Sequence, residues 1–130
     1  LILIFPFTSS ISVGTAVQHA LPHLLHDQTA MTKNIRTRTK GNYESLIAAC
    51  QAGSAATIFQ CEGAWSALLR LPAKKSDEEW TFELLQGAGV LTHPGHLFDI
   101  ETKSCIVVSL LPEHEVFIEG IRRILAAVGR

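Results

Sequence analysis

The chain has 130 residues, 47% hydrophobic and 18% charged, which suits one packed domain and argues against disorder. Its formal net charge of -1 gives no sign of a surface for nucleic acid or for a membrane. The three cysteines, Cys50, Cys61 and Cys105, are odd in number and lack metal-ligand spacing. Reduced thiols in a cytoplasmic protein are therefore expected.

The apolar run Leu1–Phe7 is too short to span a bilayer, and no cationic residue precedes it, so a signal peptide is not expected. Because the chain starts inside this run and without a methionine, we expect a piece of a longer protein.

Two helices are predicted before residue 52. Thr15 caps a short one that runs to Leu25 and that Pro22 kinks. Asp27 caps a long one over residues 28–51, whose polar middle, residues 33–40, is predicted to face solvent. The apolar positions of the long helix are Met31, Ile35, Leu46, Ile47 and Cys50.

A hairpin is predicted next, with strands over residues 57–61 and 65–71 and a tight turn at Glu62-Gly63. Ser76 and Glu79 form a capping box that opens a helix over residues 77–88. Its predicted buried positions are Trp80, Leu84, Leu85 and Ala88.

Two further strands are predicted, over residues 90–93 and 105–111. The second is apolar throughout, which is typical of a strand covered on both faces. A last helix begins at Pro112. Its predicted buried stripe consists of Val116, Phe117, Ile121, Ile124, Leu125 and Val128.

This order of elements predicts an α/β fold of the two-layer α+β kind. We expect a small, mostly antiparallel or mixed sheet of three to four strands, with helices on one side and a long helix before it.

Candidate chemistry is sparse. His19, His23 and His26 share one helix face, but no carboxylate or cysteine completes a metal site there, so no metal is expected and a subunit or domain contact is favoured. His93 and His96 flank a Pro-Gly turn at a strand end, where sites gather in open α/β sheets. Cys61 and Cys105 lie in predicted strands and are interpreted as core thiols rather than nucleophiles.

Several segments, in their order and spacing, resemble the carboxyl-terminal part of class I/II aminotransferases of fold type I, which depend on pyridoxal phosphate. The resemblance runs over about residues 11–130. It is carried by residues 12–18, residues 35–38 with Asn42 and Leu46, residues 62–65 leading into 69–72, residues 89–98, residues 108–110 and residues 117–120.

The resemblance implies that residues 1–27 are a remnant of the large domain or a linker, residues 28–51 the interdomain helix and residues 52–130 the small domain. It implies a homodimeric parent that moves an amino group between an amino acid and a 2-oxo acid. Ser12 and Thr15 would approach the cofactor of the neighbouring subunit. The Schiff-base lysine lies upstream in the family, and none of the lysines here occupies its motif. The segment alone is therefore expected to bind no cofactor and to be inactive.

The resemblance also implies a wall that closes over the substrate, formed by Trp65, Pro94, Gly95, His96 and Phe98. Val107 stands where the family commonly carries an arginine that binds the substrate carboxylate, and valine cannot do so. Another residue binds the carboxylate, or the substrate differs, or the alignment slips at this position. The alternative hypothesis is a non-catalytic, stand-alone α/β domain that binds a protein partner or self-associates through Leu1–Phe7.

Overall fold

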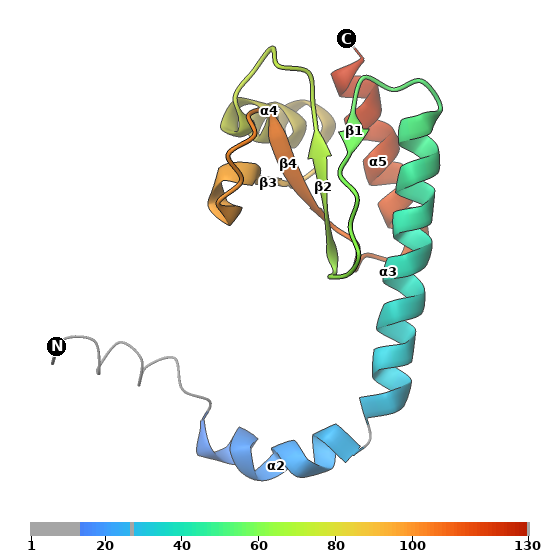
Figure 1. Ribbon diagram of the computed structural model, residues 1–130, viewed down its shortest axis with the longest axis vertical. Coiled ribbons are helices and arrows are strands. Elements are labelled where there is room, and N and C mark those ends of the chain that lie inside the picture. The colour runs from blue at the N-terminus through green and yellow to red at the C-terminus, as the bar shows by residue number, and fades with distance from the viewer. Residues whose placement is uncertain (1–13, 27, 130) are drawn as a thin grey trace, which may run out of the picture. The chain divides into compact units, whose positions relative to one another are not determined.

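A computed structural model describes residues 14–26 and 28–129 (Figure 1). The chain forms two compact units, residues 1–34 and 35–130. Ser12 and the apolar run Leu1–Phe7 lie outside the described residues. Among the described residues, no helix is both long and apolar enough to cross a membrane.

The first unit holds helix α2 (Thr15–His26) and the start of helix α3 (Gln28–Gln51). Both predicted helices are confirmed, and α2 continues across Pro22. No residue of α2 is buried. Its exposed apolar side chains are Val17, Leu21, Leu24 and Leu25. The predicted apolar stripe of α3 is wrong at Met31 and Ile35, which are both exposed.

The second unit contains one antiparallel sheet of four strands: β1 (Thr57–Ile58), β2 (Ser66–Arg70), β3 (His93–Pro94) and β4 (Cys105–Ser109), in the spatial order β1-β2-β4-β3. Its helices are α4 (Asp77–Glu83), the π-helical turn η1 (Leu84–Ala88), the 3-10 turn η2 (Gly95–Phe98) and α5 (His114–Val128). Figure 1 shows α4 and α5 behind the sheet. The predicted fold class is confirmed, including the long helix that precedes the sheet.

The core lies between the sheet and the helices. Alternate residues of the two central strands face it: Ala67 and Leu69 from β2, and Ile106 and Val108 from β4. The helices contribute Leu46, Trp80, Leu84, Phe117, Ile121, Ile124 and Val128. Residues 105–108 of β4 are all buried, as its continuous apolar run predicted.

Three predicted strands are shorter in the structure. After Ile58 the backbone Phe59 N–H still donates across the hairpin to the Leu68 carbonyl, but Cys61 lies half-buried in a loop instead of a strand. The Val90 N–H donates to the Leu84 carbonyl, which closes η1, so residues 90–92 run outside the ladder. The strand predicted over residues 105–111 ends at Ser109.

The last helix begins at His114, two residues after the predicted proline. The predicted helix burial is wrong at Val116 and Leu85, whose side chains are 65% and 44% exposed. Both residues are apolar and sit close to the buried stripe of their helix, so periodicity alone does not separate them from it.

The amide of Asn42 is fully buried and ties α3 to the chain after β4. Its Nδ2 donates to the carbonyls of Leu110 (3.0 Å) and Pro112 (2.9 Å). Its Oδ1 lies 2.8 Å from Nδ1 of His114 at the start of α5. The neighbouring Arg38 pairs with Glu113 at 2.7 Å and donates to the Leu111 carbonyl. Arg38 is nevertheless exposed, as predicted for residues 33–40, so these contacts lie at the surface.

We expect Asn42→Ala to lower the free energy of unfolding by roughly 2–4 kcal/mol, because it leaves buried carbonyl groups without donors. Urea unfolding measures this. The matched control is Asn34→Ala, at an exposed asparagine of the same helix, which should change stability by less than about 0.5 kcal/mol. Equal losses in the two variants would contradict a structural role for the buried amide.

Candidate functional site

Two of the predicted site residues, Val107 and Phe98, lie at the sheet face that points away from the core. Residues paired across antiparallel strands share a face, so Leu68, Val107 and His93 form one row across β2, β4 and β3. The ring of Phe98 meets His93 edge-on, with ring centroids 6.2 Å apart. Val107 lies at the centre of this row and is 7% exposed. Val107, where the predicted resemblance would place an arginine, thus lies between the apolar Leu68 and the aromatic His93.

The Pro94–Phe98 segment is held in place by the carboxylate of Asp77, in the first turn of α4. Asp77 Oδ1 accepts from the Cys105 N–H (2.9 Å), and Oδ2 accepts from the His96 N–H (3.1 Å). Asp77 is 7% exposed, so its charge is stabilised mainly by these bonds. One side chain thereby fixes η2 against the start of β4.

Gly95 is required by this arrangement. A Cβ added there would lie 2.9 Å from the Cβ of Cys105, 3.1 Å from its carbonyl oxygen and 3.2 Å from Asp77 Oδ2. Real Cβ atoms do not approach so closely, so only glycine lets the backbone pass. The sequence pattern pointed to Gly95 but not to Asp77, which it marked only as the first residue of the helix that Ser76 and Glu79 cap.

The imidazole of His96 points to α4, where Nε2 lies 3.4 Å from Glu78 Oε1. Trp65 is 64% exposed, and its carbonyl accepts from the Leu110 N–H. Trp65 thus lies beside the end of β4, whereas Gly95 packs against Cys105 at its start. The structure brings Val107 near Phe98, and Gly95 near His96, but it places Trp65 at the other end of the strand.

Thr15 is the exposed first residue of α2, and Ser12 lies outside the described residues. The histidines of α2 do not form a metal centre: within residues 14–26 and 28–129, no three His, Cys, Asp or Glu side chains are grouped closely enough to hold a metal ion.

Cys105 is fully buried, as expected of a core thiol. Burial raises the pKa of this thiol, and the nearby Asp77 carboxylate raises it further. Both effects disfavour the thiolate, so the group is unsuited to act as a nucleophile at neutral pH.

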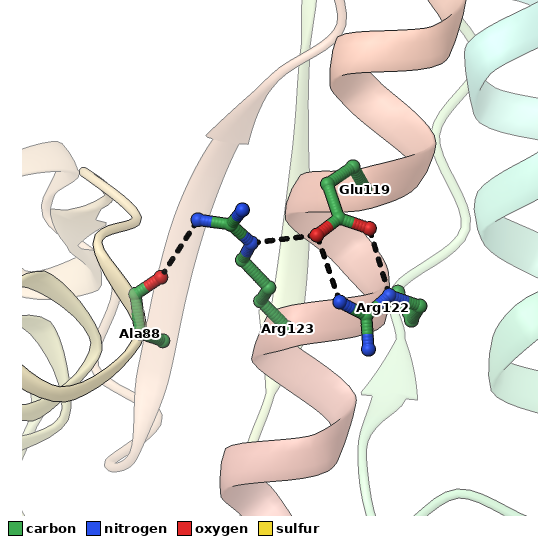
Figure 2. Close-up of polar contacts among 4 residues, drawn as sticks. All are labelled: Ala88, Glu119, Arg122 and Arg123. Carbon is green, nitrogen blue, oxygen red and sulfur yellow. Dashed lines mark hydrogen bonds and ion pairs between the residues drawn. The ribbon is translucent and has the colours of Figure 1, made fainter.

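A groove lies between residues 89–92 and α5. This groove has a volume of about 550 Å³. Its apolar floor includes Val90, Val108, Phe117, Ile121 and Ile124. Arg123, which also lines the groove, reaches from α5 and donates to the Ala88 carbonyl (3.4 Å), as Figure 2 shows.

Glu119 also lines the groove and holds the side chain of Arg123 in place. Its carboxylate accepts two bonds from Arg122, both 2.7 Å long, and one from Arg123, 2.8 Å long (Figure 2). The bonds from Arg122 and then from Arg123 lower the pKa of Glu119 from 4.5 to about 2. Glu119 therefore stays charged, and it orients Arg123 toward Ala88.

No family model matches the sequence, and no curated protein matches it significantly. Solved structures do match. The methionine aminotransferase YbdL of Escherichia coli has a TM-score of 0.70 at 22% identity, over 88% of this chain and 31% of that chain. The aromatic aminotransferase of Pyrococcus horikoshii OT3 has a TM-score of 0.73 at 16% identity, over 85% of this chain and 30% of that chain. A PLP-bound putative aminotransferase of Clostridium difficile 630 has a TM-score of 0.72 at 18% identity, over 81% of this chain and 28% of that chain.

The chain has the fold of part of an aminotransferase. It spans between 28% and 31% of the length of these three proteins. This agrees with the predicted resemblance to the carboxyl-terminal part of fold type I aminotransferases. At these identities the likeness shows the fold.

We expect Asp77→Asn to destabilise the aminotransferase-like fold by about 1.5–3 kcal/mol, since the amide loses one charged acceptor that serves a buried N–H. Urea unfolding measures the loss, and hydrogen exchange should show weaker protection of the His96 and Cys105 amides. Asp99→Asn, at an exposed carboxylate with φ 55°, is the control, because asparagine tolerates that conformation. Unchanged protection of both amides in Asp77→Asn would contradict the assigned contacts.

The hydrogen-bonded cluster of Glu119, Arg122 and Arg123 should make the free energy of unfolding depend on pH. Because folding lowers the pKa of Glu119, the contribution of this carboxylate to stability is complete above pH 4.5. It is lost as the pH falls toward about 2. Urea unfolding of the wild type and of Glu119→Gln should differ at neutral pH and converge at about pH 2. Glu101→Gln, in an exposed loop, should show a much smaller pH-dependent difference. A Glu119→Gln difference that is constant with pH would disprove the cluster.

Proposed function

We propose that this chain is the carboxyl-terminal part of a PLP-dependent aminotransferase. Residues 1–27 would be the remnant of the large domain or a linker, residues 28–51 the interdomain helix and residues 52–130 the small domain. The observation that carries the proposal is the match of more than four fifths of this chain to under a third of several aminotransferases. The parent would transfer an amino group between an amino acid and a 2-oxo acid, as a cytoplasmic homodimer.

The described residues do not fit the cofactor by themselves. A PLP site needs a lysine amine held against the cofactor, an acid at the ring nitrogen and a cradle for the phosphate. Lys75 is ion-paired with Glu83 and lies over the ring of Trp80. Lys40 pairs with Glu44, and the other described lysines, Lys33, Lys74 and Lys103, are exposed. The proposal therefore places the cofactor chemistry in the rest of the parent.

The contribution of this chain would be a wall over the substrate. The row of Leu68, Val107 and His93, with Phe98 beside it, offers apolar and aromatic contact rather than charge. Trp65, Pro94, Gly95 and His96 complete the proposed wall. A valine at position 107 cannot form the bidentate bond that an arginine gives a carboxylate. The parent would bind the substrate carboxylate through another group, or act on a substrate that lacks one there.

The alternative, a non-catalytic domain that binds a protein partner or itself, rests on Leu1–Phe7, outside the described residues. Within the described part, the exposed apolar side chains of α2 also favour a protein contact. That contact is equally expected when the chain belongs to a larger enzyme, so it does not favour the alternative.

Sequencing the genomic DNA directly upstream of Leu1 tests the proposal. We expect an in-frame large domain with a Schiff-base lysine and an aspartate for the pyridine nitrogen. The full-length protein should then bind PLP, seen as cofactor absorbance that is lost when that lysine is replaced by alanine. A start codon close to Leu1, or an upstream domain without the lysine, would overturn the proposed activity.

A further inference from the structure

Arg70, the last residue of β2, carries a charge that the described part of the chain does not neutralise. Its side chain is exposed, and among the described residues no carboxylate forms an ion pair with its guanidinium. In contrast, Arg38, Arg122 and Arg123 each pair with a glutamate. The arginine fork presents N–H donors in the geometry that binds a carboxylate through two parallel hydrogen bonds. Arg70 is therefore available to an anion from outside the chain.

The backbone register places Arg70 on the sheet face that points away from the core. Arg70 pairs with Cys105 of β4, and Leu68 pairs with Val107. Residues two apart in a strand share a face, so Arg70 and Leu68 lie on the same side of β2. Val107 is then the diagonal neighbour of Arg70, at a separation that a long side chain spans. The guanidinium can therefore reach the row that Leu68, Val107 and His93 form.

The charge of Arg70 acts at the start of β4. Burial and the Asp77 carboxylate raise the pKa of the Cys105 thiol, and the positive charge of Arg70 works in the opposite direction. The guanidinium therefore lies near this thiol. The Asp77 carboxylate is already engaged, because its oxygens accept from the N–H groups of Cys105 and His96. It thus leaves the charge of Arg70 unpaired.

The rest of this face offers no second permanent charge. Apart from Arg70, its positions on the two central strands and on β3 are Ser66, Leu68, Cys105, Val107, Ser109 and His93. The ring of Phe98 lies beside His93 and adds aromatic surface. A ligand on this face thus meets a single guanidinium beside an apolar strip, which Leu68 and Val107 form. A second carboxylate on that ligand would lie against the strip without a cation to pair with, which is unfavourable.

We propose that this face binds an acid with one carboxylate and an apolar body, in which Arg70 binds the carboxylate and Leu68 and Val107 contact the body. The inference rests on the proposed function, in which this face closes over the substrate. It narrows the substrate of the parent to an amino acid or 2-oxo acid with one carboxylate and an apolar or aromatic side chain. Arg70 supplies the bidentate contact that Val107 cannot form.

The test titrates the isotope-labelled 130-residue chain with phenylpropanoate and follows the Nε–H signal of Arg70 by NMR. We expect this signal to shift and the shift to saturate. Phenylpropanol, which keeps the ring and lacks the carboxylate, should bind roughly tenfold more weakly, because it forms no charge-assisted hydrogen bond. Glutarate, with two carboxylates and no ring, should also bind more weakly than phenylpropanoate.

Variants of Arg70 separate recognition of the charge from contact with the apolar body. Arg70→Gln should weaken phenylpropanoate binding roughly tenfold and leave the affinity for phenylpropanol unchanged. Arg70→Lys keeps the charge without the fork and should restore only part of the affinity. The matched control is Arg36→Gln, at an exposed arginine of α3, which should change neither affinity.

The fold should survive these changes. The melting temperature of Arg70→Gln should stay within about 2 °C of that of the wild type, because an exposed side chain without a partner contributes little to stability. A loss of phenylpropanoate binding in this variant is then a loss of recognition rather than of structure.

Three results would overturn the inference. The first is an Arg70 signal that phenylpropanoate does not shift, or equal affinities for the acid and the alcohol. The second is an equal effect of Arg70→Gln and Arg36→Gln on the affinity for phenylpropanoate. The third is tighter binding of glutarate than of phenylpropanoate, which would contradict the single carboxylate and the apolar body.

The titration needs neither PLP nor the part of the parent that precedes Leu1, so its failure is distinct from failure of the proposed function. In an active full-length parent, Arg70→Gln should raise KM for an apolar amino acid roughly tenfold and change kcat by less than about twofold. An unchanged KM would overturn the inference alone. Absence of an upstream aminotransferase domain would overturn the proposed function and, with it, the substrate role of Arg70.

Discussion

The carboxylate of Asp77 is the contact on which the candidate site depends. It belongs to α4, yet its two oxygens bind the amides of His96 in η2 and Cys105 in β4. A charge so far removed from water needs such donors, and both donors come from chain distant in sequence. Because the backbone at position 95 comes this close to Cys105 and to the carboxylate, it has no room for a side chain. One buried charge thus sets both the path of the Pro94–Phe98 segment and the residue at its turn.

Asn42 plays the corresponding part at the other end of β4. Its amide binds the carbonyls of Leu110 and Pro112 and the ring of His114, where the chain leaves the sheet and enters α5. Between these two polar anchors the side chains that β4 presents to the core, Ile106 and Val108, are apolar. The hydrophobic effect stabilises the layers without fixing direction. The directional bonds of the two side chains, together with the backbone bonds of the sheet, fix how the strand ends lie.

Much of the fold could be predicted because its signals are local. The continuous apolar run identified β4, and Ser76 with Glu79 identified the start of α4. The roles of Asp77 and Asn42 could not be predicted, because their partners lie 19 or more residues away and no local pattern marks a buried polar side chain. The site residues were named from a family resemblance, which gives positions along a chain but not distances. Trp65 and Gly95 were therefore grouped, although they pack at opposite ends of one strand.

The outermost strands of the sheet, β1 and β3, have two residues each, whereas the central strands have five. Short edges present few unpaired amides and carbonyls, which limits uncontrolled pairing between sheets of different molecules. The exposed apolar side chains of α2, in contrast, are free to contact other molecules. Aggregation of the isolated chain at high concentration should therefore proceed through side-chain contacts. The aggregates should be amorphous rather than fibrillar.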